Sequence, residues 1–214
     1  MGTPTSLAYS TPFKYTDRAS RARYTAEKYA AILKGRVLDV GCDVKSLALH
    51  LPAGASYIGI DVVPTADIVL NLDRQNIPFP DRSFDTVVCT DVLEHLERIH
   101  EVFDELCRVS DSRIILSLPN PYRNLLLVAA DNRPRFRQYG LPAEIPEDRH
   151  RWFFGALEAQ RFIAERAAQN RFEVEHMDVD ERGLPSCIVG GRDLSQDPNF
   201  ALGTTWAVLR REAV

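Results

Sequence analysis

Three residues in the first third of the chain have the types and spacing of a nucleoside-binding site. Asp39 and Gly41 close a short apolar run, and Asp61 closes a second one about 20 residues later. Gly41 allows the backbone to turn sharply beneath a ligand, and a helix opening near Val44 would point its unpaired N–H groups at that ligand. A carboxylate at Asp61 can accept hydrogen bonds from the two hydroxyls of a ribose.

This chemistry requires a strand, a tight turn, a short helix and a second strand. Val37, Leu38 and Val40 have the β-branched, apolar character of a strand that is covered on both faces. Residues 57–60 provide the second strand, which places Asp61 at its carboxyl end. The segment 36–61 therefore predicts the first β-α-β unit of an open α/β sheet.

A second candidate group follows at Thr90, Asp91 and Val92. Residues 86–90 read as a strand and 91–109 as one amphipathic helix, with Thr90 or Asp91 as its N-cap. The helix is predicted from an apolar stripe at steps of three and four: Val92, Leu96, Ile99, Val102, Phe103, Leu106 and Val109. The group would lie at the carboxyl edge of the sheet, where open α/β folds hold ligands.

The other elements follow from the same patterns. Helices are expected over 17–33 and 155–170, and strands over 68–70, 113–118, 172–176 and 204–209. The connection after Asp61 is too short for more than one turn of helix.

Four motifs in order, VLDVGCD, YIGID, NLDRQNIPFPDRSFDTVVCTDVLEHL and IILSLPNP, closely resemble class I S-adenosylmethionine (SAM) dependent methyltransferases, particularly small bacterial ones. The resemblance covers residues 24–121 well and the remainder loosely. It implies one α/β domain over residues 1–214. The implied fold is a Rossmann-like, doubly wound, seven-stranded and mostly parallel sheet with an antiparallel last strand and helices on both faces.

The resemblance also implies roles for particular residues, with SAM as the cofactor. The turn would hold the methionine part, Asp61 and its neighbour Val62 the ribose, and Leu72 and Asp73 the adenine. Asp73 has a second interpretation, as a cap before Arg74. The residues that would contact SAM are Asp39, Gly41, Cys42, Asp43, Asp61, Val62, Leu72, Asp73, Thr90, Asp91 and Val92.

The glycine turn departs from the family pattern. The family usually has D/E-x-G-x-G-x-G, whereas this chain keeps Gly41 and has Asp43 and Lys45 at the next two glycine positions. Asp tolerates a positive φ, but Lys45 would either pair with Asp43 or obstruct the ligand. The rival hypothesis is therefore a cofactor-free scaffold or partner-binding protein. A nicotinamide dehydrogenase is disfavoured because no G-x-G-x-x-G follows the first strand.

Two histidines are candidate catalytic bases. His95 would sit one turn into the helix, near the methyl acceptor, and a neutral imidazole there could take the acceptor's proton. His150 is the second candidate. The alternative for His95 is a packing and hydrogen-bonding role in the L-E-H-L motif. No H-E-x-x-H motif or cysteine/histidine cluster is present in the sequence, so no metal site is expected.

Residues 119–154 interrupt the regular pattern and are predicted to form a substrate lid. The segment holds several arginines, which suit phosphate or carboxylate, but Glu144, Glu147 and Asp148 offset that charge. A solvated, internally paired loop is the plainer interpretation. Residues 1–16 read as a tail or as a flap over the cofactor. We expect the acceptor to be a small molecule or a sugar-like compound.

Composition limits the partners. The chain has 214 residues and a net charge of −4, which gives no bulk attraction to nucleic acid or to an anionic membrane. Its scattered cysteines predict free thiols and a cytoplasmic protein. Residues 180–200 would either overhang the sheet edge or contact a second subunit, so a homodimer is left open.

Overall fold

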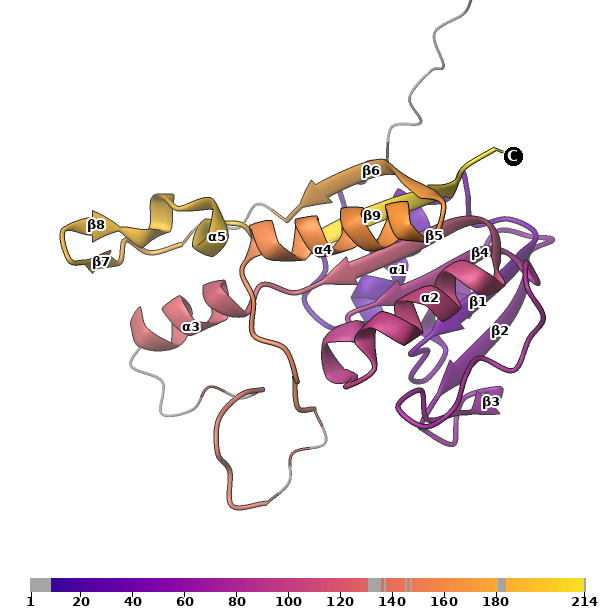
Figure 1. The fold of residues 1–214 in the computed structure, drawn as a ribbon, viewed down its shortest axis with the longest axis horizontal. Coiled ribbons are helices and arrows are strands. Elements are labelled where there is room, and N and C mark those ends of the chain that lie inside the picture. The colour runs from indigo at the N-terminus through magenta and orange to yellow at the C-terminus, as the bar shows by residue number, and fades with distance from the viewer. Residues whose placement is uncertain are drawn as a thin grey trace, which may run out of the picture.

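The central element of the computed structural model is one seven-stranded sheet (Figure 1). The structure describes residues 9–130, 136, 138–144, 146, 148–180 and 184–213. The strand order is β3-β2-β1-β4-β5-β9-β6, and β9 runs antiparallel to both of its neighbours. The strands are β1 (Arg36–Val40), β2 (Ser56–Asp61), β3 (Ile68–Val69), β4 (Phe84–Thr90), β5 (Ser110–Leu118), β6 (Phe172–Val179) and β9 (Thr205–Arg211). The predicted fold class is confirmed.

Helices cover both faces of this sheet, α2 and α4 on one and α1 on the other (Figure 1). A small hairpin, α5 and α3 lie beyond the sheet on the left of that view. The remaining elements are α1 (Arg18–Lys28), η1 (Ser46–His50), η2 (Leu93–His95), α2 (Ile99–Val109), α3 (Pro121–Ala130), α4 (Ala156–Gln169), the hairpin β7 (Ile188–Val189) and β8 (Arg192–Asp193), η3 (Leu194–Gln196) and α5 (Pro198–Ala201).

Successive side chains along the strands point to opposite faces of the sheet, so the sheet has a hydrophobic core on each face. In β1, Leu38 and Val40 pack in the cluster with α2 and α4, whereas Val37 packs in the cluster with α1. In β9, Leu209 joins the first cluster and Trp206 the second. The strands are thus covered on both faces, as their near-continuous apolar character predicts.

The helix predicted over residues 17–33 ends earlier, at Lys28. Asp17 is the N-cap and forms a capping box with Ser20. After Lys28 the chain forms turns, in which the carbonyl of Ile32 accepts hydrogen bonds from the Thr86 hydroxyl (2.8 Å) and the Lys34 backbone (2.9 Å). These turns bring Tyr29 into the core below the sheet.

The helix predicted over residues 91–109 is broken in two, and this correction matters for the site. Asp91 has a φ of 52°, and after η2 the chain is extended at Leu96 before α2 begins. The carbonyls of Glu94 and Leu96 accept hydrogen bonds from the Arg151 backbone (2.8 Å) and the Trp152 indole (2.7 Å). Partners from a distant segment therefore replace the missing helical bonds.

The segment predicted as a lid begins with α3, which sequence reasoning did not assign. The segment 180–200, for which no regular element was predicted, contains the β7–β8 hairpin, η3 and the start of α5 within its described part. As expected, the described residues 62–67 between β2 and β3 form bends and turns and no helix. Of the helices in the described ranges, none combines the length and the apolar character that a membrane span requires.

Candidate functional site

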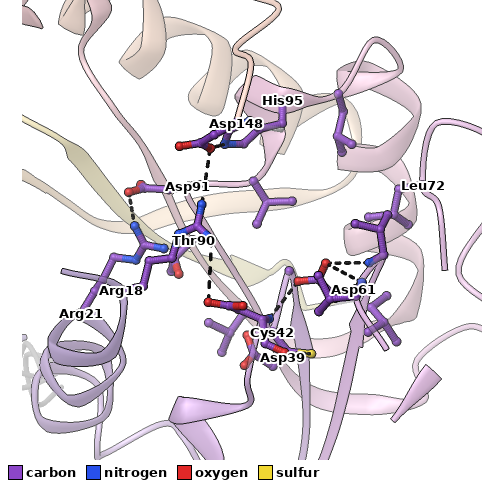
Figure 2. A pocket seen from close by; sticks show the side chains of 18 of the residues that line it. Arg18, Arg21, Asp39, Cys42, Asp61, Leu72, Thr90, Asp91, His95 and Asp148 are labelled. Atoms are coloured by element: carbon purple, nitrogen blue, oxygen red, sulfur yellow. Dashed lines mark hydrogen bonds and ion pairs between the residues drawn. The ribbon is translucent and has the colours of Figure 1, made fainter. Parts of the chain in front are cut away.

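A cavity of about 1060 Å³ opens at the carboxyl ends of β1, β2 and β4 (Figure 2). All of the residues predicted to contact a cofactor line it, and so does His95. His150 does not line this cavity. It lies instead on an adjoining cavity of about 630 Å³, which shares Pro146, Arg149 and Arg151 with the first. The structure thus brings the predicted site residues to one edge of the sheet.

The turn after β1 keeps left-handed backbone at all three positions where the family usually has glycine. Gly41 has a φ of 77°, Asp43 of 49° and Lys45 of 58°. At Gly41 a side chain is excluded by packing as well, since an added Cβ would lie 2.2 Å from Cγ2 of Val92. The turn therefore retains a glycine-like path with two non-glycine residues in it.

The Lys45 side chain points away from the cavity, which it does not line. Its ammonium nitrogen lies 2.7 Å from Oδ1 of Asp67, and Asp67 also accepts a hydrogen bond from the Gly59 backbone (2.8 Å). These partners lower the pKa of the Asp67 carboxyl. Lys45 thus neither pairs with Asp43 nor obstructs the cavity; it fastens the turn to the segment before β3.

Asp61 is held rigidly at the end of β2. One carboxylate oxygen accepts the backbone N–H of Asp43 (2.8 Å), and the other accepts that of Val62 (2.6 Å). The oxygen bonded to Asp43 keeps a second acceptor position for a ligand, whereas the other oxygen also accepts a longer hydrogen bond from the Val63 backbone N–H (3.4 Å). The same residue thereby joins the turn to the second strand and presents acceptors to the cavity.

Asp39 is the most deeply placed carboxyl of the cavity wall. It is 6% exposed, and its partner is the Tyr57 hydroxyl (2.8 Å). Burial and, to a smaller extent, the nearby Asp61 raise the pKa of Asp39 to about 7, against the opposing effect of the Tyr57 hydrogen bond. Cys42, on the same turn, is buried, and burial raises its thiol pKa to about 12. It is a packing residue rather than a nucleophile.

Asp91 is fixed by two partners on the far wall. The Ser117 hydroxyl donates to its carboxylate (2.5 Å), and Arg21 of α1 forms an ion pair with it. Sequence reasoning assigned no role to Arg21 or Arg18, yet both line the cavity. Their i,i+3 spacing places both side chains on one side of α1, and this spacing could have indicated that they act at one site.

Arg18 lies across the opening, as Figure 2 shows. Its guanidinium nitrogens lie 3.8 Å from the carboxylate of Asp43 and 3.4 Å from that of Asp148. At the other side of the cavity, Asp73 accepts a hydrogen bond from the Arg98 backbone (3.2 Å) just before α2. Asp73 therefore lines the cavity and also binds the backbone of the residue that precedes α2.

The two candidate bases lie in contact. The ring centroids of His95 and His150 are 4.5 Å apart and perpendicular to each other. Burial and, to a smaller extent, the neighbouring His95 together lower the pKa of His150 to about 4, so His150 is neutral at pH 7. Next to them, Glu94 is 1% exposed, and its burial raises the pKa of its carboxyl well above the usual range. Sequence reasoning did not single out Glu94.

The family model described as a methyltransferase domain matches residues 15–176. A comparison with curated proteins gave no match. Among solved structures, the chain resembles a SAM-dependent methyltransferase from Archaeoglobus fulgidus (18% identity, 91% of this chain and 95% of that chain, TM-score 0.60). It also resembles one from Methanosarcina mazei (16% identity, 85% and 94%, TM-score 0.56).

A third similar structure is the magnesium protoporphyrin IX methyltransferase of Synechocystis, solved with bound S-adenosylhomocysteine (SAH), with 18% identity over 96% of this chain and 91% of that chain and a TM-score of 0.55. These structures share the fold of this chain. The family model spans most of the chain, including β1 to β5 and the cavity they form. The protein therefore belongs to the class I SAM-dependent methyltransferase family.

Proposed function

We propose that the protein transfers the methyl group of SAM to a small-molecule or carbohydrate-like acceptor, with SAM in the larger cavity. The observation that carries this proposal is the turn from Gly41 to Lys45. It keeps the backbone path that the cofactor needs, with the Lys45 side chain turned away and the Asp61 carboxylate aligned by backbone N–H groups. The features that first favoured a cofactor-free scaffold are thus accommodated.

Acidic groups on the cavity wall support this cofactor. SAM carries a positive sulfonium and an amino group, and the wall presents the carboxyl groups of Asp39, Asp43, Asp61 and Asp91, of which Asp43 and Asp91 also pair with Arg18 and Arg21. Leu72 is an apolar neighbour for the adenine, with Asp73 beside it. We assign the ribose to Asp61 and Val62, the methionine part to the turn, and the wall near the methyl group to Thr90, Asp91 and Val92.

SAM, when bound, supplies a methyl group on a positively charged sulfur, which is a reactive electrophile. The residues of this chain then have three tasks: to hold the acceptor in line, to exclude water, and to take up a proton if the acceptor is a hydroxyl. We assign the last task to the pair formed by His95 and His150, whose rings border the two cavities.

The adjoining cavity is our proposed acceptor site. Its described lining offers the indole of Trp152, the carboxylate of Glu97 and the guanidinium groups of Arg149 and Arg151. A flat aromatic face among polar and charged groups suits a small polar acceptor such as a sugar. A cytoplasmic location, a homodimer and the absence of nucleic-acid substrates stay predictions from the sequence.

The direct test is isothermal titration of the purified protein with SAH, which needs no acceptor. We expect micromolar binding, about 8 kcal/mol, and a loss of ~1 to 3 kcal/mol for Asp61→Ala, because hydrogen bonds to the ligand disappear. Asp85→Asn is the matched control: Asp85 also accepts a backbone N–H (2.7 Å, from Arg36), but at the opposite edge of the sheet.

Two results would contradict the assignment. One is a titration that shows no heat of binding up to millimolar SAH, in folded protein that carries no bound nucleoside by mass spectrometry. That result would favour the cofactor-free scaffold. Equal binding by wild type and Asp61→Ala would leave SAM binding intact but move its ribose away from Asp61.

A further inference from the structure

Three side chains with metal-ligating atoms meet beside the cofactor cavity, although the sequence predicted no metal site. Glu94 and His95 lie on η2, and His150 comes from the segment that follows the predicted lid. One ligating atom from each residue can be chosen so that all three lie within 4.8 Å of one another. The cluster forms because the break between η2 and α2 lets residues 149–152 pack against the carbonyls of Glu94 and Leu96.

The hydrogen bonds of His95 determine which of its ring nitrogens is free. Its Nδ1 lies 3.1 Å from the carbonyl oxygen of Arg149. A carbonyl can only accept, so Nδ1 carries the proton and donates. In the neutral ring, Nε2 therefore keeps its lone pair, and Figure 2 shows the His95 side chain beside Asp148.

His150 is held in the same tautomer by a longer chain of bonds. The Tyr139 hydroxyl donates its single proton to the carbonyl of Trp152 (2.5 Å). Its oxygen must then accept from Nδ1 of His150, which lies 3.2 Å away. Both imidazoles are thus oriented by an oxygen atom at Nδ1, which is the arrangement that prepares histidines for metal binding through Nε2.

Glu94 supplies the independent observation. It is 1% exposed, and its Oε2 has no hydrogen-bond partner among the residues described. Its Oε1 lies 3.9 Å from Nε2 of His95. A buried carboxylate oxygen without a donor is costly unless a cation or a proton compensates it. A protonated His95 paired with Asp148 (3.5 Å) is the rival explanation, but it provides no donor for Glu94 Oε2.

We propose that Glu94, His95 and His150 bind a divalent first-row transition-metal ion, such as Mn²⁺, Co²⁺ or Zn²⁺. Two imidazole nitrogens and one carboxylate oxygen suit these ions better than Mg²⁺ or Ca²⁺. Three protein ligands leave coordination positions open, and His95 borders the larger cavity. On the proposed function, on which this last point rests, those positions would face oxygen atoms of the acceptor, and with the ion bound the two imidazoles would hold the ion instead of taking up the acceptor's proton.

The test is titration of the metal-free protein with Co²⁺, followed by visible absorption, with equilibrium dialysis of Zn²⁺ as a second measurement. We expect one ion per chain. Glu94→Gln and His150→Gln should each weaken binding at least about tenfold. Tyr139→Phe retains all three ligands but removes the bond that orients His150, and should weaken binding about 10–100-fold. His50→Gln, an exposed histidine outside the cluster, is the matched control and should bind as wild type does.

The outcomes separate this proposal from the proposed function. Wild-type protein that binds no ion, or Glu94→Gln and His150→Gln variants that bind as wild type does, would overturn the metal site. SAH binding without metal binding would refute the metal site alone, whereas metal binding without SAH binding would refute the cofactor assignment alone. If near-ultraviolet circular dichroism shows that either ligand variant does not fold, the Tyr139→Phe variant provides the test. Metal binding by Tyr139→Phe equal to that of the wild type would then overturn the proposal.

Discussion

The contact between Gly41 and Val92 allows a sharp test of how the cofactor turn is built. Gly41→Ala places a methyl group where Cγ2 of Val92 already lies, 2.2 Å from the added Cβ, on a residue whose φ is 77°. The substitution therefore introduces two separable faults, a backbone strain and a steric clash. Both occur at the base of the cavity, where the first strand ends.

The two faults have different magnitudes. Left-handed backbone costs a residue with a side chain roughly 1–2 kcal/mol, and overpacking a well-packed position costs about 1–3 kcal/mol more. Alanine also restricts the unfolded chain, which offsets about 0.4–1 kcal/mol. We expect Gly41→Ala to lower the free energy of unfolding by about 2–4 kcal/mol.

Two further variants separate the terms. Gly54→Ala has a φ of 89° and no atom within 4 Å of the added Cβ, so it reports backbone strain alone. The double variant Gly41→Ala/Val92→Ala removes the clash and should recover about 1–3 kcal/mol relative to the sum of the single variants. Urea unfolding followed by fluorescence suits the assay, because Trp206 is fully buried between α1 and the sheet.

Additive changes in the free energy of unfolding would contradict the predicted clash. If the double variant equals the sum of the single variants within about 0.5 kcal/mol, the two side chains do not clash and the turn has relaxed. If Gly41→Ala costs no more than Gly54→Ala, packing against Val92 contributes nothing and only the backbone conformation demands glycine.

Two further predictions concern buried charges. Because the pKa of Asp39 is raised to about 7 in the folded protein, its contribution to stability is complete below about pH 4 and is lost as the pH rises through 7. Asp39→Asn should remove that decline of a few kcal/mol, measured by urea unfolding of SAH-free protein from pH 4 to 8; parallel curves for both proteins would contradict it. Asp178→Asn removes the carboxylate partner (2.6 Å) of the buried Lys28 ammonium, which keeps the Tyr24 hydroxyl (3.0 Å), and since Asp178 is partly exposed the change should cost about 1–3 kcal/mol. The control Glu173→Gln, whose pair with Arg210 is exposed, should cost less than about 1 kcal/mol, and equal losses would show that burial of Lys28 is unimportant.

Local patterns were sufficient where the sequence itself sets the structure. The strands β1 and β4 follow from short apolar runs with β-branched residues, and the position of Asp61 follows from the end of such a run. The lining of the cavity by Asp39, Asp61 and Thr90 follows because parallel strands end at the same edge.

Long-range contacts account for what the sequence could not predict. The apolar stripe through Leu96 is continuous, yet the helix breaks there because Arg151 and Trp152 bind carbonyls that a helix would have used. The Arg21–Asp91 ion pair joins residues that no local pattern relates. The meeting of His95 with His150 depends on that break in the helix, so neighbouring residues alone could not reveal it.

The bonds from Arg151 and Trp152 to the break before α2 also bear on how such enzymes diversify. A segment that only covered a site could be exchanged between relatives without changing the sheet. Here residues 149–152 donate hydrogen bonds to backbone carbonyls of residues 94–96, and the carbonyl of Arg149 accepts one from the His95 imidazole. The segment 149–152 and the backbone of residues 94–96 therefore stabilise each other, and a chimera would have to transplant both segments together.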